Sequence, residues 1–189
     1  PNPFDLYVNG LDVPVIEEFG AGTRALSEGD PQARAALLRD PAFRRTWAKE
    51  WGNAWAGRAY HRDLFEATII DCPDPSLVGR SFGEVARARS ADPVDTFLDL
   101  QAEHGDDLRW YTVVGNDRPD QLGWIMAHPA VLVGFSDAGA HLRNMAYYNF
   151  PLRMLKRVVE AAAAGRPVMD VSRAIHRLTG EIADYLGID

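Results

Sequence analysis

The stretch "VLVGFSDAGAHL", residues 131–142, decides how the fold of this chain is interpreted. Its first five residues are apolar or glycine, and a short apolar run before turn-forming residues is typical of a buried strand. We therefore predict a strand over residues 130–135. Ser136 and Asp137 open the turn that follows, which ends at His141. Asp and Gly are ordinary turn formers, so a plain turn and a catalytic loop both fit this pattern.

The composition limits the classes of protein that the chain can represent. It has 189 residues, 47% apolar and 25% charged, which suffices for one sizeable core or for one domain with an appendage. A net charge of −7 argues against nucleic acid as a partner, because phosphate contacts need a basic excess. No apolar run approaches the roughly 18 residues of a membrane span, so no membrane partner is expected. Cys72 is the only cysteine, which excludes an internal disulfide and a cysteine-based zinc site and favours a reducing, cytoplasmic location.

Three Asp-Pro pairs mark the predicted starts of helices. At Asp30, Asp40 and Asp92 the carboxylate can cap free backbone N–H groups, and the proline that follows is tolerated in the first helical turn. Gly105 is the expected stop of the third of these helices. Further helices are predicted over residues 81–89, 118–129, 150–165, 169–178 and 179–187.

Strands are predicted between these helices, over residues 4–8, 64–71 and 108–114 in addition to 130–135. The remainder of the first 29 residues is rich in Pro and Gly and is predicted to be loop. Strands that alternate with helices indicate an α/β protein, here one dominated by helix.

Four aromatic residues recur at four-residue spacing: Phe43, Trp47, Trp51 and Trp55. They share one helix face if the helix continues through Gly52. We expect this stripe to pack into the core, since aromatic helix faces usually do. Stacking on a ligand and an exposed interface are the alternatives.

Longer stretches resemble a known family. "GFSDAGAHL" (134–142), "FPLRMLKRVVE" (150–160) and "AIHRLTGEIADYLGI" (174–188) are similar to the C-terminal part of amidohydrolases of the D-aminoacylase type, the N-acyl-D-amino-acid deacylases. The segment "LVGRSFGEVARARSADPVDTFLDLQAEHG" (77–105) resembles the family's connection between its last two strands. The resemblance covers roughly residues 65–188.

This resemblance implies a fragment of a metal-dependent-hydrolase (β/α)₈ TIM barrel. Residues 1–63 would be a loop-rich and helical insertion, and residues 64–189 the C-terminal barrel segment with its final strand, 130–135, and the terminal helices. Such a barrel needs 200 residues or more, so the chain is expected to be the last quarter to third of an enzyme.

The same resemblance assigns roles to the turn after the predicted strand. Catalytic groups of such barrels lie at the C-terminal ends of strands, as Asp137 would. In the family the corresponding aspartate contacts the metal and its water, accepts a proton as the amide is attacked and passes it to the leaving amine. Ser136, His141, Arg143 and Asn144 are the further candidates, either to bind substrate or to support Asp137. His141 is equally well interpreted as a surface histidine.

The family binds its metal through a His-x-His pair, which this sequence lacks. Zinc is therefore expected in the full-length parent and not in this chain alone. The expected partners are a small-molecule amide substrate and the remainder of the barrel, and the isolated chain is expected to self-associate through unpaired strand edges. The family's substrate-binding arginine lies closer to its Phe-Pro pair, where this chain has "NMAYYN", residues 144–149.

The remaining histidines, His61, His104, His128 and His176, are predicted to be structural or exposed, because none follows a convincing strand. A different class of function also fits the sequence. The chain would then be a non-catalytic helical interaction or oligomerisation module, with the tryptophan stripe as its contact surface.

Overall fold

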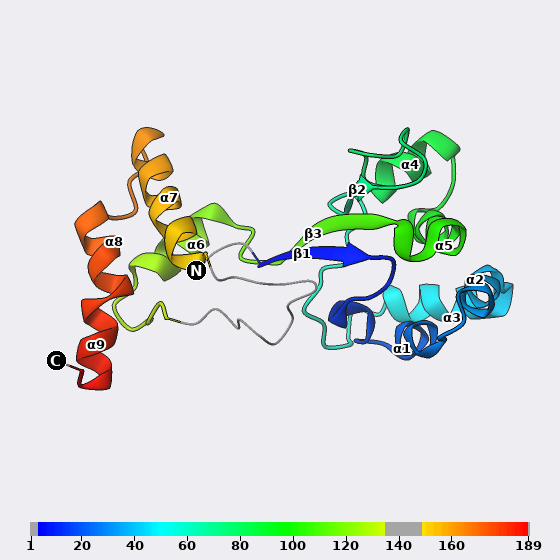
Figure 1. Cartoon of the computed structure of the whole chain (residues 1–189), viewed down its shortest axis with the longest axis horizontal. Helices are drawn as coiled ribbons and strands as arrows, with labels where there is room; N and C mark the ends of the chain where they lie inside the picture. Colours follow the sequence, from blue (N-terminus) through cyan, green and yellow to red (C-terminus); the bar gives the residue numbers. More distant parts are fainter. Residues whose placement is uncertain (1–3, 135–148, 189) are drawn as a thin grey trace. The chain divides into compact units, whose positions relative to one another are not determined.

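The computed structural model describes residues 4–134 and 149–188, whose elements are shown in Figure 1. The chain divides into two compact units. We call Asp5–Val114 the N-terminal unit, and Gly115–Asp189 together with Pro1–Phe4 the C-terminal unit. Each unit is described by itself.

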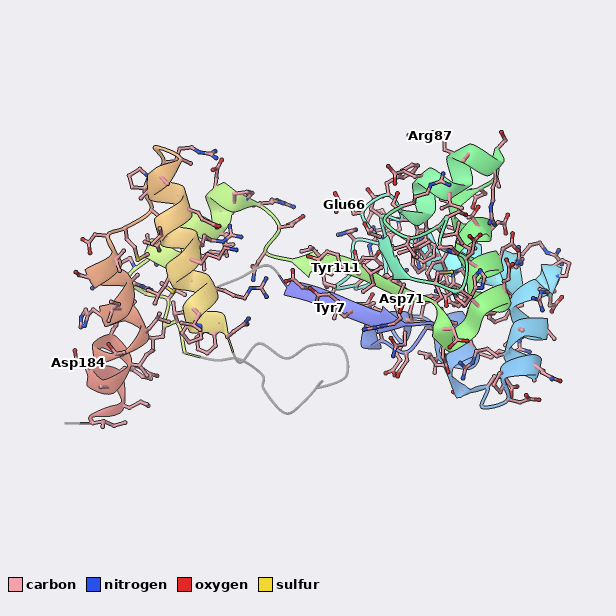
Figure 2. The ribbon with its side chains drawn as sticks, turned by 45° about the horizontal axis from the view of Figure 1, so that its top comes forward. Tyr7, Glu66, Asp71, Arg87, Tyr111 and Asp184 are labelled. Atoms are coloured by element: carbon pink, nitrogen blue, oxygen red, sulfur yellow. The ribbon has the colours of Figure 1, made fainter. Side chains whose placement is uncertain are left out.

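A three-stranded antiparallel sheet is formed by β1 (Phe4–Asn9), β2 (Thr68–Asp71) and β3 (Arg109–Gly115), in the order β1-β3-β2. Strands β2 and β3 pair with Ile69 opposite Trp110, and the register shifts after Ile69. Both of these side chains are buried. Tyr7 and Tyr111 lie on the neighbouring strands β1 and β3 (Figure 2). Their ring centres are 5.1 Å apart.

Three helices of the N-terminal unit, α2, α3 and α5, begin where the Asp-Pro pairs predict. The carboxylates of Asp30, Asp40 and Asp92 accept hydrogen bonds from backbone N–H groups two residues further on, at 2.8–3.0 Å. Helix α4 begins with a capping box between Ser81 and Glu84, which satisfies two further N–H groups. The elements are α1 (Gly20–Ser27), α2 (Pro31–Arg39), α3 (Pro41–Trp51), α4 (Phe82–Arg89) and α5 (Pro93–His104), with 3₁₀ turns at Pro14–Ile16 and Gly105–Asp107.

The aromatic stripe lies mostly inside this unit, as predicted. Phe43, Trp47 and Trp51 are buried, and the Trp47 ring lies 6.3 Å from that of Phe97 on α5. Trp55 departs from the prediction: it is 98% exposed, because α3 ends at Trp51 and the periodicity ends with it. The buried part of the stripe is thus core and not a contact surface.

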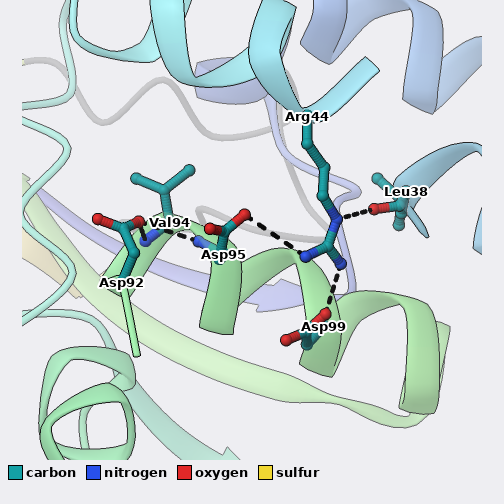
Figure 3. Close-up of polar contacts among 6 residues, drawn as sticks. All are labelled: Leu38, Arg44, Asp92, Val94, Asp95 and Asp99. Carbon is teal, nitrogen blue, oxygen red and sulfur yellow. Dashed lines mark hydrogen bonds and ion pairs between the residues drawn. The ribbon is translucent and has the colours of Figure 1, made fainter. Parts of the chain in front are cut away.

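Arg44 connects three helices of the N-terminal unit (Figure 3). Its guanidinium donates to the Leu38 carbonyl at the end of α2, at 2.7 Å. It also pairs with Asp99 at 2.5 Å and with Asp95 at 3.4 Å, both on α5. Since Arg44 belongs to α3, this one side chain fixes α3 against both neighbours.

Helix α1 was not predicted, because residues 20–27 were expected to be loop. The N-cap residue, Phe19, makes no side-chain hydrogen bond to the first turn, and two of the first three residues of the helix are glycines. The helix depends instead on distant contacts: Glu50 accepts from the Ala21 N–H at 2.7 Å. A methyl group on Gly22 would come within 1.8 Å of the Ile16 carbonyl oxygen, so only glycine allows this approach.

The C-terminal unit contains α6 (Pro119–Ala127), α7 (Phe150–Ala163), α8 (Val171–Leu178) and α9 (Gly180–Leu186), as predicted. These helices pack around one buried cluster. The cluster consists of Leu122, Met126, Val133, Met154, Val158 and Ala174. None of the helices in the described parts of the chain has the length and apolar composition that a membrane span requires.

The fold class is therefore helix-rich α/β, as predicted, but two expectations differ from the structure. The described strands β2 and β3 run antiparallel, whereas neighbouring strands of a (β/α)₈ barrel are parallel. The strand predicted over residues 130–135 is not formed in its described part: Ala130 lies in a turn, and residues 131–134 have no regular secondary structure. The Val131 carbonyl accepts instead from a side chain, that of Arg177.

Candidate functional site

The residues predicted to carry chemistry lie outside the described part of the chain. They are Ser136, Asp137, His141, Arg143 and Asn144, all between residues 135 and 148. We call residues 135–148 the turn segment. The structure describes the residues that hold the turn segment at either end, and these define the frame of the candidate site.

On the N-terminal side, a buried arginine holds the chain that leads into the turn segment. Arg177, on α8, has no exposed surface. Its Nη2 donates to the His128 carbonyl at 3.0 Å and also to the Val131 carbonyl. Val131 additionally donates its N–H to the His128 carbonyl, at 3.1 Å. These bonds fix the backbone from residue 128 to residue 131.

The charge of Arg177 is balanced within the C-terminal unit. Its Nη1 lies 3.5 Å from Glu181 Oε1, one helical turn further on. Arg173, which is more exposed, lies at the same distance from that oxygen. Two buried atoms of this network have no hydrogen-bond partner among the described residues, Arg177 Nε and Glu181 Oε2. Arg177 and Glu181 therefore do not satisfy all of each other's hydrogen-bonding atoms, and Arg177 uses its Nη2 for the backbone carbonyls of His128 and Val131.

Packing holds the next residues. Val133 is buried in the cluster that α6, α7 and α8 share, to which Met126 and Met154 also belong. Gly134 follows directly against α9, since a methyl group there would lie 3.3 Å from Ile182 Cδ1. The last residues before the turn segment, Val133 and Gly134, thus pack against helices of the C-terminal unit.

The C-terminal side of the turn segment returns to the same cluster. Helix α7 begins at Phe150, whose side chain packs against the cluster. The Asn149 carbonyl accepts from the Arg153 N–H at 2.9 Å and so forms the first turn of the helix. The described residues on both sides of the turn segment are therefore attached to one core.

Two of the other histidines, His61 and His128, have structural contacts. His61 Nε2 lies 2.9 Å from the Val113 carbonyl oxygen and 3.2 Å from Glu66 Oε2. The His128 ring packs on that of Trp124, with 4.6 Å between the ring centres. Within residues 4–134 and 149–188, no three His, Cys, Asp or Glu side chains gather as metal ligands.

Sequence reasoning missed Arg177. The only local signal is its position: it lies three residues after buried Ala174, on the apolar face of α8. An arginine at such a position needs buried partners, but the partners lie 46 and 49 residues earlier in the chain and cannot be identified from the sequence.

Comparison with known proteins identifies relatives but no family. No family model matches the chain, and no solved structure matches it. Uncharacterized proteins of Mycobacterium tuberculosis and Mycobacterium bovis are 50% identical to it over 190 residues. The match covers the whole of this chain and 31% of each relative, so the chain spans about a third of their length.

Proposed function

We propose that the chain is the C-terminal part of a metal-dependent amidohydrolase that cleaves the C–N amide bond of an N-acyl amino acid in the cytoplasm. The proposal starts from the likeness of residues 134–142, 150–160 and 174–188 to N-acyl-D-amino-acid deacylases. The observation that carries it is the anchoring of the turn segment at both ends, by Arg177 and Val133 before it and by Phe150 after it. A catalytic aspartate must be held in a defined position to act on a bound substrate, and the proposal places Asp137 between these anchored residues.

The proposed role of Asp137 is that of a general base and acid. Its carboxylate takes the proton of the attacking water as the new C–O bond forms at the amide carbon. It then delivers this proton to the nitrogen as the C–N bond breaks, so that an amine and a carboxylic acid leave. Ser136, His141, Arg143 and Asn144 would bind the substrate or orient the carboxylate.

The zinc of the proposed enzyme does not fit the residues of this chain alone. The described residues bring no set of ligands together, and the sequence has no His-x-His pair. Zinc would need ligands from elsewhere in the full-length protein. The relatives extend to about three times the aligned length, as a complete barrel would require.

Exposed apolar residues on α8 and α9 support an origin in a larger barrel. Val171 and Ile175 lie one turn apart on α8, and Tyr185 and Leu186 lie on α9; all four are exposed. Apolar faces of this kind usually pack against another surface, and the remainder of the barrel would supply it. In the isolated chain the same residues would promote self-association.

The test is Asp137→Asn in the full-length protein, assayed against a panel of N-acyl-D- and N-acyl-L-amino acids. Hydrolysis should fall by about two to four orders of magnitude, while the melting temperature stays unchanged. The matched control is Asp184→Asn, which removes the same charge from an exposed position on α9 (Figure 2). Near-normal turnover of the Asp137 variant would contradict the proposed role.

A further inference from the structure

The C-terminal unit contains an open cleft that the proposed amide hydrolysis does not use. We call it the α6–α7 cleft: it lies between these two helices and the connection that leads from α7 to α8, and its volume is about 360 Å³. Three side chains that can recognise a ligand line it, Trp124, Arg157 and Arg166, together with Asp120. The volume suffices for a small molecule that contains one ring.

Trp124 presents its ring to the cleft. Its side chain is 63% exposed, whereas Trp47 and Trp110 are fully buried. The His128 ring packs against the Trp124 ring, with 4.6 Å between the ring centres. An exposed indole that is held by a neighbour in this way is a preformed stacking surface.

The two arginines of the cleft are without partners among the described residues. The side chains of Arg157 and Arg166 make no hydrogen bond or ion pair there, unlike those of Arg34, Arg44 and Arg177, which all do. Each guanidinium therefore retains donors for a bidentate contact with a carboxylate. With Asp120 also unpaired, the lining carries one net positive charge, which a ligand with a single negative charge balances.

The floor of the cleft is apolar and closely packed. Gly123 lies against Val168, and a methyl group on Gly123 would come within 3.2 Å of Val168 Cγ2. Because glycine has no side chain, Val168 can pack directly against the α6 backbone beside Trp124. The cleft thus brings together a side chain on which a ring can stack, Trp124, and two positively charged side chains, Arg157 and Arg166.

We propose that the α6–α7 cleft binds a small monocarboxylic acid that carries an aromatic ring. The ring stacks on Trp124, and the carboxylate is held by Arg157 and Arg166. This inference is independent of the proposed amide hydrolysis, since it requires neither Asp137 nor a metal. It remains testable if the proposed hydrolysis is disproved.

The experiment is a titration of the ¹⁵N-labelled chain with 3-phenylpropionate, followed through the indole N–H resonances of its five tryptophans. Trp124→Phe identifies the Trp124 resonance. This resonance should move and saturate, whereas that of Trp55, which is 98% exposed outside the cleft, should stay in place. Equal movement of the two resonances, or no movement of Trp124, would overturn the proposal.

Matched ligands and variants separate the two parts of the recognition. The neutral 3-phenylpropionamide and the ring-free hexanoate should each bind more weakly than 3-phenylpropionate. Arg157→Gln and Arg166→Gln should each raise its Kd by about two- to fivefold, and the double variant by about tenfold. The control Arg45→Gln removes an exposed, unpaired arginine of α3 and should leave Kd unchanged. Equal affinity for the amide, for hexanoate or for inorganic phosphate would contradict the proposed ligand class.

Discussion

Arg177 carries a charge into a fully buried position, which is costly unless its donors are used. Its Nη2 serves two backbone carbonyls, and its Nη1 faces Glu181. Those carbonyls belong to the residues that lead into the turn segment. The side chain therefore links the stability of α8 to the position of the backbone before Asp137.

Removal of Arg177 should destabilise the C-terminal unit. Arg177→Met leaves two backbone carbonyls without this partner and Glu181 with Arg173 alone, and we expect a loss of about 3 kcal/mol. Arg177→Lys should recover part of this loss, because it keeps the charge but not the forked geometry. The measurement is hydrogen exchange of the α8 amides. Arg173→Met, at a partly exposed position with one contact, is the control and should cost less than about 1 kcal/mol.

Tyr60 should make the stability of the N-terminal unit depend on pH in the alkaline range. Burial raises the pKa of Tyr60 to about 12, and its hydroxyl lies 3.5 Å from Thr112 Oγ1. Below pH 10 the phenol is neutral in both states. Above pH 10 the unfolded chain ionises first, so the free energy of unfolding should fall by roughly 2 kcal/mol as the pH rises to 12.

Tyr60→Phe should abolish this part of the alkaline loss. Urea unfolding at pH 9 and at pH 11.5 measures it, with exposed Tyr185→Phe as the control. A loss of equal size in both variants would show that burial of Tyr60 is not its cause.

At the scale of elements, the sequence was informative wherever a local signal determines structure. Asp30, Asp40 and Asp92 each cap the predicted helix, because capping needs only the residue and its next neighbours. Helix α1 was missed because its stability comes from Glu50 and from the approach of Gly22 to Ile16. The strand expected over residues 130–135 is not formed in its described part for a related reason. Strand pairing depends on distant partners, and here the Val131 carbonyl accepts from the Arg177 side chain instead of from another strand.

Helix α3 offers a matched pair of tryptophans. Trp47 is buried among Phe19, Phe43 and Phe97, whereas Trp55 lies beyond the end of the helix in solvent. Trp47→Ala should cost about 3–5 kcal/mol in urea unfolding, and Trp55→Ala less than about 0.5 kcal/mol. Trp47→Phe should cost less than Trp47→Ala, since the buried Nε1 has no hydrogen-bond partner to lose among the described residues. Similar losses for Trp47→Ala and Trp55→Ala would contradict the assignment of the stripe to the core.

At the scale of the whole molecule, charge is divided unevenly. Residues 115–189 contain eight basic and eight acidic side chains, so residues 1–114 carry the entire net charge of −7. The proposed anion-binding cleft therefore lies in the electrically balanced part of the chain. The sequence predicts a functional turn within residues 135–148 from its residue types, but it could not predict the cleft, whose lining combines α6, α7 and the connection after α7.

The proposed function places Asp137 in this chain and the zinc ligands elsewhere in the full-length protein, which leads to a final prediction. A zinc site needs three or four protein ligands, and around Asp137 the sequence offers only His141 as a further strong one. The 189-residue chain, purified alone, should therefore hold no stoichiometric zinc and hydrolyse no N-acyl amino acid, whereas the full-length protein should do both. Elemental analysis and the amide assay on both proteins provide the measurement. Tight stoichiometric zinc in the short chain would show that its own residues form the site, and a metal-free but active full-length protein would contradict the metal dependence.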